Sequence, residues 1–162
     1  MAPPRIVART GWTTDELAAA IDAAPIAPPF DLVTLMIGVN DQYRGRTVGD
    51  FRPRFRDLIE RAVRFAADRA DHVIVLSIPD WSGTPFADGR DRARIAAEVD
   101  AFNDAVRAEV KRAGVRYVDL TPLSRRAGHD PDLTAADGLH PSARMYAAWV
   151  EAVLPVVRAA IE

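Results

Sequence analysis

Short runs of apolar residues alternate along this chain with longer segments in which apolar residues recur every three or four positions. A continuous apolar run is typical of a strand covered on both faces, and the longer period is typical of an amphipathic helix. The runs predict four strands, at Arg5–Ala8, Phe30–Ile37, His72–Ile78 and Val115–Leu120. The periodic segments predict a helix from Thr13, a second over Asp50–Arg69, a third that ends near Gly114 and a last over Ser142–Ala160.

The order of these elements predicts an α/β fold. Strands that alternate with helices form a parallel sheet with helices on both faces. Two long irregular stretches, Pro79–Asp88 and Thr121–Leu139, each follow a predicted strand. They therefore lie at the carboxyl edge of the sheet, where open α/β sheets bind their ligands.

Composition narrows the class of protein. The chain has 162 residues, which suits one domain, and a net charge of -2, which gives no basic surface for nucleic acid. It has no cysteine, so disulfides, thiolate metal sites and cysteine nucleophiles are excluded. The N-terminus lacks the apolar run of a secretory signal, and no apolar stretch reaches the ~18 residues of a membrane span. We expect a cytoplasmic protein without nucleic-acid or membrane partners.

Two features near the predicted strands could stabilise an oxyanion. Gly38-Val39-Asn40-Asp41 directly follows a predicted strand, and the Asn40 side chain offers two uncharged N–H donors. Gly11 lies between a predicted strand and a predicted helix, where its backbone N–H could be a second donor. The alternative for both is structural, because glycine and asparagine are common in tight turns.

The sharpest candidate for chemistry is Asp137-Gly138-Leu139-His140. A carboxylate three residues before a histidine, across a turn, can bond the imidazole and set its tautomer. Asp137 would then orient His140, which would take the proton of a serine hydroxyl. The alternative is an Asp-Gly turn followed by a histidine that caps the next helix. The other two histidines, His72 and His129, have no such partner nearby in the sequence.

Together these motifs resemble the SGNH hydrolases, also called GDSL-like esterases or lipases. The resemblance implies a flavodoxin-like three-layer α/β/α fold and a serine esterase that acts on a small ester or acyl substrate without a cofactor. It implies Asp137 and His140 as catalytic residues and Gly11 and Asn40 as oxyanion donors. Asp41 and Trp81 would bind substrate, although Trp81 could equally anchor its loop.

One part of the family pattern is not found. The nucleophile belongs to a Gly-Asp-Ser block on the first strand, and no such block occurs here. A strand with its crossover helix needs ~30 residues or more, for which the chain has no room before Arg9. We expect residues 1–162 to be one N-terminally truncated SGNH-like domain that is inactive alone. The chain has four serines, none of which we expect to act as nucleophile: Ser77, Ser82, Ser124 and Ser142.

The missing strand also bears on folding and partners. It would lie between Arg5–Ala8 and Phe30–Ile37. Without it, the exposed edges of these two strands could pair with each other or with another chain, or the fold could be marginally stable. Self-association through these edges is therefore possible. The chain would then be a non-catalytic module that binds an acyl or carbohydrate-like ligand or pairs by strand addition.

A metal-dependent hydrolase is a weaker alternative. Several acidic residues and a histidine could lie at one edge of the sheet, but the chain has no HExxH motif and no paired-histidine spacing. The candidates are Asp41, Asp80, Asp119, Asp137 and His140.

Overall fold

The computed structural model describes residues 3–162. Its parallel sheet has three strands, β1 (Val33–Leu35), β2 (Val73–Leu76) and β3 (Arg116–Val118), in the order β1-β2-β3. Val33 lies opposite Val73, and Ile74 lies opposite Arg116. The sheet and its helices confirm the predicted α/β class.

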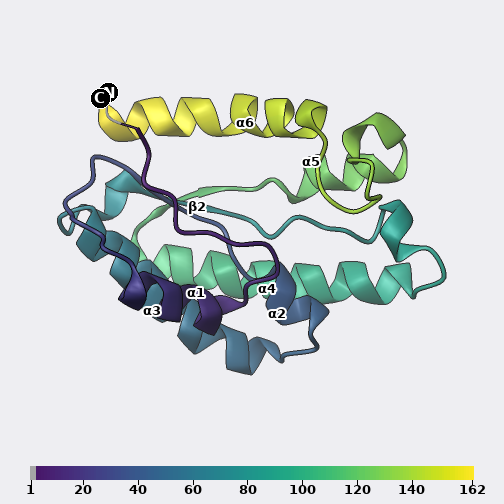
Figure 1. Ribbon diagram of the computed structural model, residues 1–162, viewed down its shortest axis with the longest axis horizontal. Helices are drawn as coiled ribbons and strands as arrows, with labels where there is room; N and C mark the ends of the chain where they lie inside the picture. Colours follow the sequence, from purple (N-terminus) through teal and green to yellow (C-terminus); the bar gives the residue numbers. More distant parts are fainter. Residues whose placement is uncertain (1–2) are drawn as a thin grey trace.

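Helices cover both faces of this sheet (Figure 1). One face carries α1 (Thr14–Ala23), α2 (Val39–Tyr43), α3 (Val48–Phe65) and α4 (Arg92–Ala113), and the other carries α6 (Ala143–Ile161). A short helix, α5 (Thr121–Arg125), follows β3. Single 3-10 turns lie at Ala70–His72, Pro85–Ala87, Arg126–Gly128 and Pro131–Leu133.

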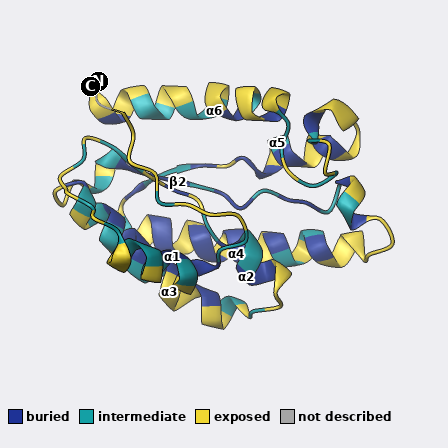
Figure 2. Ribbon diagram, viewed as in Figure 1, coloured by how far each residue is buried: buried dark blue, intermediate teal, exposed yellow. Residues whose placement is uncertain are grey.

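The buried parts of the helices lie mostly on the sides that face the sheet (Figure 2). Between α3 and α4, the ring centroids of Phe51 and Phe102 are 4.9 Å apart, and Phe51 also stacks on Phe55. On the opposite face, Met145 and Trp149 of α6 pack in one cluster with Ile74 of β2. Burial of these apolar faces is the main force that holds the helices on the sheet.

Helix ends follow the sequence signals. At the start of α1, the N–H of Thr13 donates to the Glu16 carboxylate at 2.8 Å as part of a capping box. At the end of α4, Gly114 adopts a left-handed conformation with φ 68°, which glycine tolerates without a steric cost. The strands are shorter than the apolar runs that predicted them.

The predicted strand at Arg5–Ala8 is wrong. Its backbone makes no hydrogen bond within residues 3–162, and Ile6 is 74% exposed. A strand needs a paired neighbour, and an apolar run alone cannot supply one. The segment therefore does not close on β1, whose only hydrogen-bonded neighbour in the described sheet is β2.

Within residues 3–162, no helix is both long and apolar enough to cross a membrane.

Candidate active site

A cavity of about 500 Å³ opens at the carboxyl edge of the sheet. Four predicted site residues line it: Gly11 before α1, Asn40 on α2, Trp81 after β2 and His140 before α6. A volume of this size accommodates a small organic ligand. The fold therefore brings residues far apart in the sequence to one site.

His140 and Asp137 form a close pair beside this cavity. His140 Nδ1 lies 2.6 Å from Asp137 Oδ2, and the Asp137 Oδ1 accepts the backbone N–H groups of Leu139 and His140, both at 2.9 Å. These two backbone bonds, with the imidazole bond next, lower the pKa of Asp137 to about 2. Asp137 is therefore a carboxylate at neutral pH. It favours the tautomer with hydrogen on Nδ1 and leaves Nε2 as a proton acceptor.

The turn that carries this pair is fixed at several points. Gly138 has φ 72°, and its carbonyl accepts the N–H of Phe86 at 2.9 Å. The N–H of Ala135 donates to the carbonyl of His140 at 2.7 Å, and Thr134 forms an antiparallel bridge with Pro141. The Asp-Gly turn of the alternative is present and holds the imidazole in place, but Ser142, and not His140, caps the next helix.

Asn40 and Gly11 lie side by side in the cavity wall. Asn40 Nδ2 donates one hydrogen to the carbonyl of Trp12 at 2.9 Å, and its second hydrogen has no acceptor within residues 3–162. Gly11 has φ +88°, and its N–H likewise makes no hydrogen bond among the described residues. The Arg44 guanidinium holds the Gly11 carbonyl at 2.6 Å. Two N–H groups are therefore available to an oxyanion.

Asp41 has another role than the predicted one. Its fully buried carboxylate accepts the N–H and the hydroxyl of Thr14 at 2.9 and 2.8 Å, and Arg46 lies 3.2 Å away. It does not line the cavity. Neighbouring residues of a helix point in different directions, so Asp41 faces α1 while Asn40 faces the cavity. Asp41 fixes the start of α1 and, with it, the adjacent Gly11 turn.

Trp81 is both a cavity wall and a loop anchor. Its indole Nε1–H donates to Gln42 Oε1 at 2.8 Å, and the residue is 7% exposed. Its ring meets Tyr43 and Phe86 edge-on, with centroids 5.6 and 5.9 Å away. Trp81 therefore anchors its loop and also lines the cavity, and its contact with a substrate stays a prediction.

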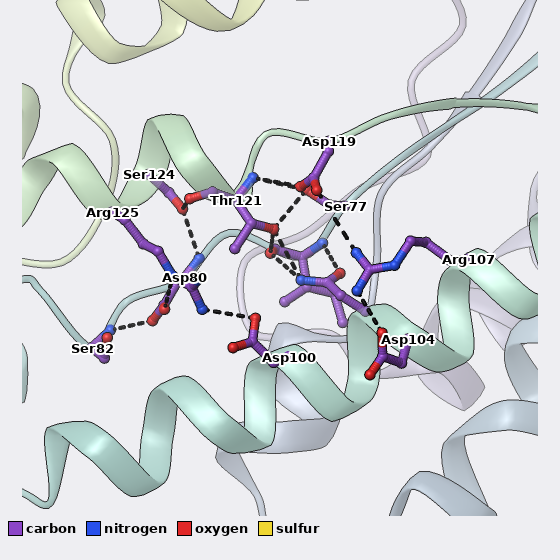
Figure 3. Close-up of polar contacts among 12 residues, drawn as sticks. Ser77, Asp80, Ser82, Asp100, Asp104, Arg107, Asp119, Thr121, Ser124 and Arg125 are labelled. Atoms are coloured by element: carbon purple, nitrogen blue, oxygen red, sulfur yellow. Dashed lines mark hydrogen bonds and ion pairs between the residues drawn. The ribbon is translucent and has the colours of Figure 1, made fainter.

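Ser77 does not face the cavity. It is fully buried between β2 and α5, close to Thr121 (Figure 3). Its Oγ accepts the N–H groups of Leu120 at 2.7 Å and Thr121 at 3.0 Å. The Thr121 hydroxyl also donates to it at 3.0 Å. These bonds tie β2 to α5, so Ser77 is a structural residue.

The other three serines have structural contacts of their own or lie away from the cavity. Ser124 lines the cavity, but its buried Oγ donates to the Thr121 carbonyl and accepts the Asp80 N–H, both at 2.8 Å (Figure 3). Ser142 caps α6 with its Oγ. Ser82 does not line the cavity. No serine within residues 3–162 bonds His140.

Sequence reasoning missed several wall residues. Tyr43 and Phe86 complete an aromatic wall with Trp81. On the α6 side, Thr134 Oγ1 and Trp149 Nε1 are buried without a partner in the described residues, and both residues line the cavity. The helical period places Trp149 on the inward face of α6, but no sequence signal singled out Thr134.

The acidic residues of the metal alternative have separate partners. Asp80 bonds Arg125 at 2.8 Å, and Asp119 accepts the Thr121 N–H at 3.0 Å (Figure 3). Asp41 and Asp137 bond α1 and His140, as described above. Across residues 3–162, no three His, Asp or Glu side chains are grouped to hold a metal ion.

Solved structures share this fold. LAE5, an alpha/beta hydrolase enzyme from the metagenome of Lake Arreo, Spain, has a TM-score of 0.68 at 22% identity, over 94% of this chain and 70% of that chain. Axe2, an acetylxylan esterase from Geobacillus stearothermophilus, has a TM-score of 0.69 at 19% identity, over 91% and 68%. TesA has a TM-score of 0.66 at 19% identity, over 91% and 73%. No curated protein matches the sequence.

The family resemblance of the motifs extends over most of the chain. The model of the GDSL-like Lipase/Acylhydrolase family matches residues 2–148. This range includes the Gly11, Asn40 and His140 motifs, and the match confirms the predicted family. The chain belongs to the GDSL-like lipase/acylhydrolase family.

Proposed function

We propose that the cavity is the acyl-transfer site of a serine esterase that acts on small esters. The observation that carries the proposal is the Asp137–His140 pair beside a cavity that Gly11 and Asn40 also line. A base with its orienting carboxylate and two free N–H donors is the set of groups that ester hydrolysis by a serine requires. Family membership supports hydrolase chemistry.

The reaction would run in two acyl transfers. A serine Oγ forms a bond to the ester carbonyl carbon while its proton passes to His140 Nε2, and the Gly11 N–H and Asn40 Nδ2 bind the resulting oxyanion. Collapse breaks the bond to the alcohol oxygen, which takes the proton from His140. Water then attacks the acyl-serine with His140 as base again, which releases the acid and frees the serine.

We infer that none of the serines within residues 3–162 is the nucleophile. We therefore propose that the serine comes from outside the described residues and that the 162-residue chain alone has no serine-dependent turnover. The buried, fully bonded state of Ser77 and Ser124 supports this. Thr134 Oγ1 and Trp149 Nε1 support it too. Both atoms are buried on the α6 side without a hydrogen-bond partner within residues 3–162, so they can bond a group from outside these residues.

One observation favours a second candidate, a non-catalytic module that pairs with another chain. β1 has no described neighbour on its outer side, and Met36 beside it is 42% exposed. An unpaired strand edge accepts an added strand through its backbone groups.

A fluorophosphonate probe tests the assignment of the nucleophile. Intact-mass analysis of the 162-residue chain is expected to show no adduct, with an active serine esterase as positive control. An adduct on any of the four serines that disappears in His140→Ala would show that the chain holds its own nucleophile. Size-exclusion chromatography with light scattering tests the module, which requires a dimer or larger assembly.

A further inference from the structure

Two side chains at α2 bind the backbone of the Gly11 turn. Asn40 Nδ2 donates to the carbonyl of Trp12 at 2.9 Å, and Arg44 Nη2 donates to the carbonyl of Gly11 at 2.6 Å. Arg44 directly follows the last residue of α2, and its N–H donates to the Asn40 carbonyl at 3.0 Å, so the two residues keep helical spacing. Residues four apart on a helix lie on one face. One face of α2 therefore holds two consecutive carbonyls of the turn.

The Gly11 turn has little backbone support of its own. Among residues 3–162, neither the Gly11 carbonyl nor the Trp12 carbonyl accepts a backbone N–H. The Trp12 N–H reaches the Arg9 carbonyl only at 3.4 Å. Gly11 has φ +88°, and glycine adopts positive and negative φ about equally well, so the residue itself does not fix the direction of its N–H. The side chains at α2 therefore hold this conformation.

The Arg44 guanidinium is itself fixed at a second point. Its Nη1 donates to the Glu16 carboxylate at 3.2 Å. The other oxygen of Glu16 accepts the Thr13 N–H at 2.8 Å in the capping box of α1. A guanidinium presents its N–H groups in a rigid fork, so a bond on one side sets the direction of the other. Arg44 therefore joins the Gly11 turn to the first turn of α1.

Arg44 acts on the cavity only through Gly11. Gly11 lines the cavity, whereas Arg44 does not. The ion pair of Arg44 with Glu16 is exposed, with 47% and 39% of the two side chains accessible, and such pairs add little to stability. The bond to the Gly11 carbonyl therefore gives Arg44 a role that its ion pair does not explain.

We propose that Arg44 is a positioning residue, which holds the Gly11 N–H toward the cavity beside the Asn40 amide. This inference rests on the proposed function, in which these two groups bind an oxyanion. Donors that are held in place before the reaction need no reorganisation when the negative charge forms. Arg44 would supply that order to the Gly11 donor, as the bond to Trp12 supplies it to Asn40.

NMR of the 162-residue chain tests this role without turnover. In Arg44→Met, which keeps the chain length but has no donor, the order parameter of the Gly11 N–H is expected to fall from about 0.85 to about 0.6 or lower. The shift of this signal by ethyl butyrate should fall about twofold or more, because a mobile donor faces the carbonyl for less of the time. Arg44→Lys, which restores one donor, should recover part of both, and the Asn40 amide should change less than Gly11.

Arg54→Met is the matched control. Arg54 is an exposed arginine that also donates to a carbonyl, that of Asp50 at 2.7 Å, but within its own helix α3. All three variants are expected to melt within about 3 °C of wild type, because the lost contacts are exposed.

Equal order parameters of Gly11 in wild type and Arg44→Met, or an equal loss of order in Arg54→Met, overturn the proposal. The order parameter is measured without ligand, so it tests the hold of Arg44 on Gly11 separately from ester binding. Ethyl butyrate that leaves all signals of the wild-type chain unchanged would instead contradict the proposed esterase site.

Discussion

The imidazole of His140 and the carboxylate of Asp137 are joined by a 2.6 Å contact between Nδ1 and Oδ2, while two backbone N–H groups bond the other carboxylate oxygen. Three donors on one carboxylate favour its charged form. The pair is therefore set before any ligand binds.

The bonds to this carboxylate, those from the backbone first, predict a low pKa for Asp137. Its pKa is expected at about 2, below the ordinary 3.8, in a carbon-13 NMR titration of the side-chain carboxyl groups, with Asp137→Asn to assign the signal. Because the folded-state pKa is lowered, its stabilising effect is present above pH 3.8 and is lost as the pH falls toward 2. A value near 4 would show that the backbone bonds do not hold the carboxylate.

Glu109 is expected to be the most important charge for stability. Its buried carboxylate bonds Arg52, Arg56 and Arg112 at 2.6, 2.9 and 2.7 Å, and these bonds, that of Arg56 first, lower its pKa to about 2. Glu109→Gln should cost about 2–3 kcal/mol at pH 7, less than for a fully buried pair because the arginines are partly solvated. Urea unfolding measures this loss of stability.

The pH dependence of stability separates the contribution of the Glu109 charge from that of its packing. The lowered pKa of Glu109 means that its contribution is present above pH 4.5 and fades toward pH 2, so the gap between wild type and Glu109→Gln should narrow over that range. Glu60→Gln, which removes an exposed partner of Arg112, is the control and should cost under about 1 kcal/mol. Equal losses in both variants would contradict the account.

Gly38 is expected to tolerate no side chain. It has φ +125°, and a Cβ there would lie 2.7 Å from Ile78 Cδ1 and 2.8 Å from Phe51 Cε2. Gly38→Ala should therefore destabilise the fold by about 2–4 kcal/mol, from overpacking and backbone strain together. Gly45→Ala isolates the backbone part, since Gly45 has φ +73° and open space around it. Similar thermal shifts in the two variants would show that the contacts do not matter.

Local signals in the sequence predicted α1, α3, α4 and α6, the parallel sheet and the His140–Asp137 pair, because apolar periods and a three-residue spacing act within a few residues. They did not predict α5, which lies in the predicted irregular stretch Thr121–Leu139. The predicted strand at Arg5–Ala8 is wrong because a strand needs a paired neighbour, and an apolar run does not show whether one is present. The direction of the Asp41 side chain could not be predicted, because it depends on how α2 packs against α1. Thr134 stands out only once the cavity is formed.

We propose that an ester carbonyl binds between Asn40, Gly11 and His140. An NMR titration with ethyl butyrate tests it, with the ether of the same length as control. The ester is expected to shift the Asn40 side-chain amide, the Gly11 N–H and the His140 imidazole saturably, and the ether, which has no carbonyl, should leave the two donors unchanged. An ester that moves none of these signals, or an ether that moves them equally, would contradict the account.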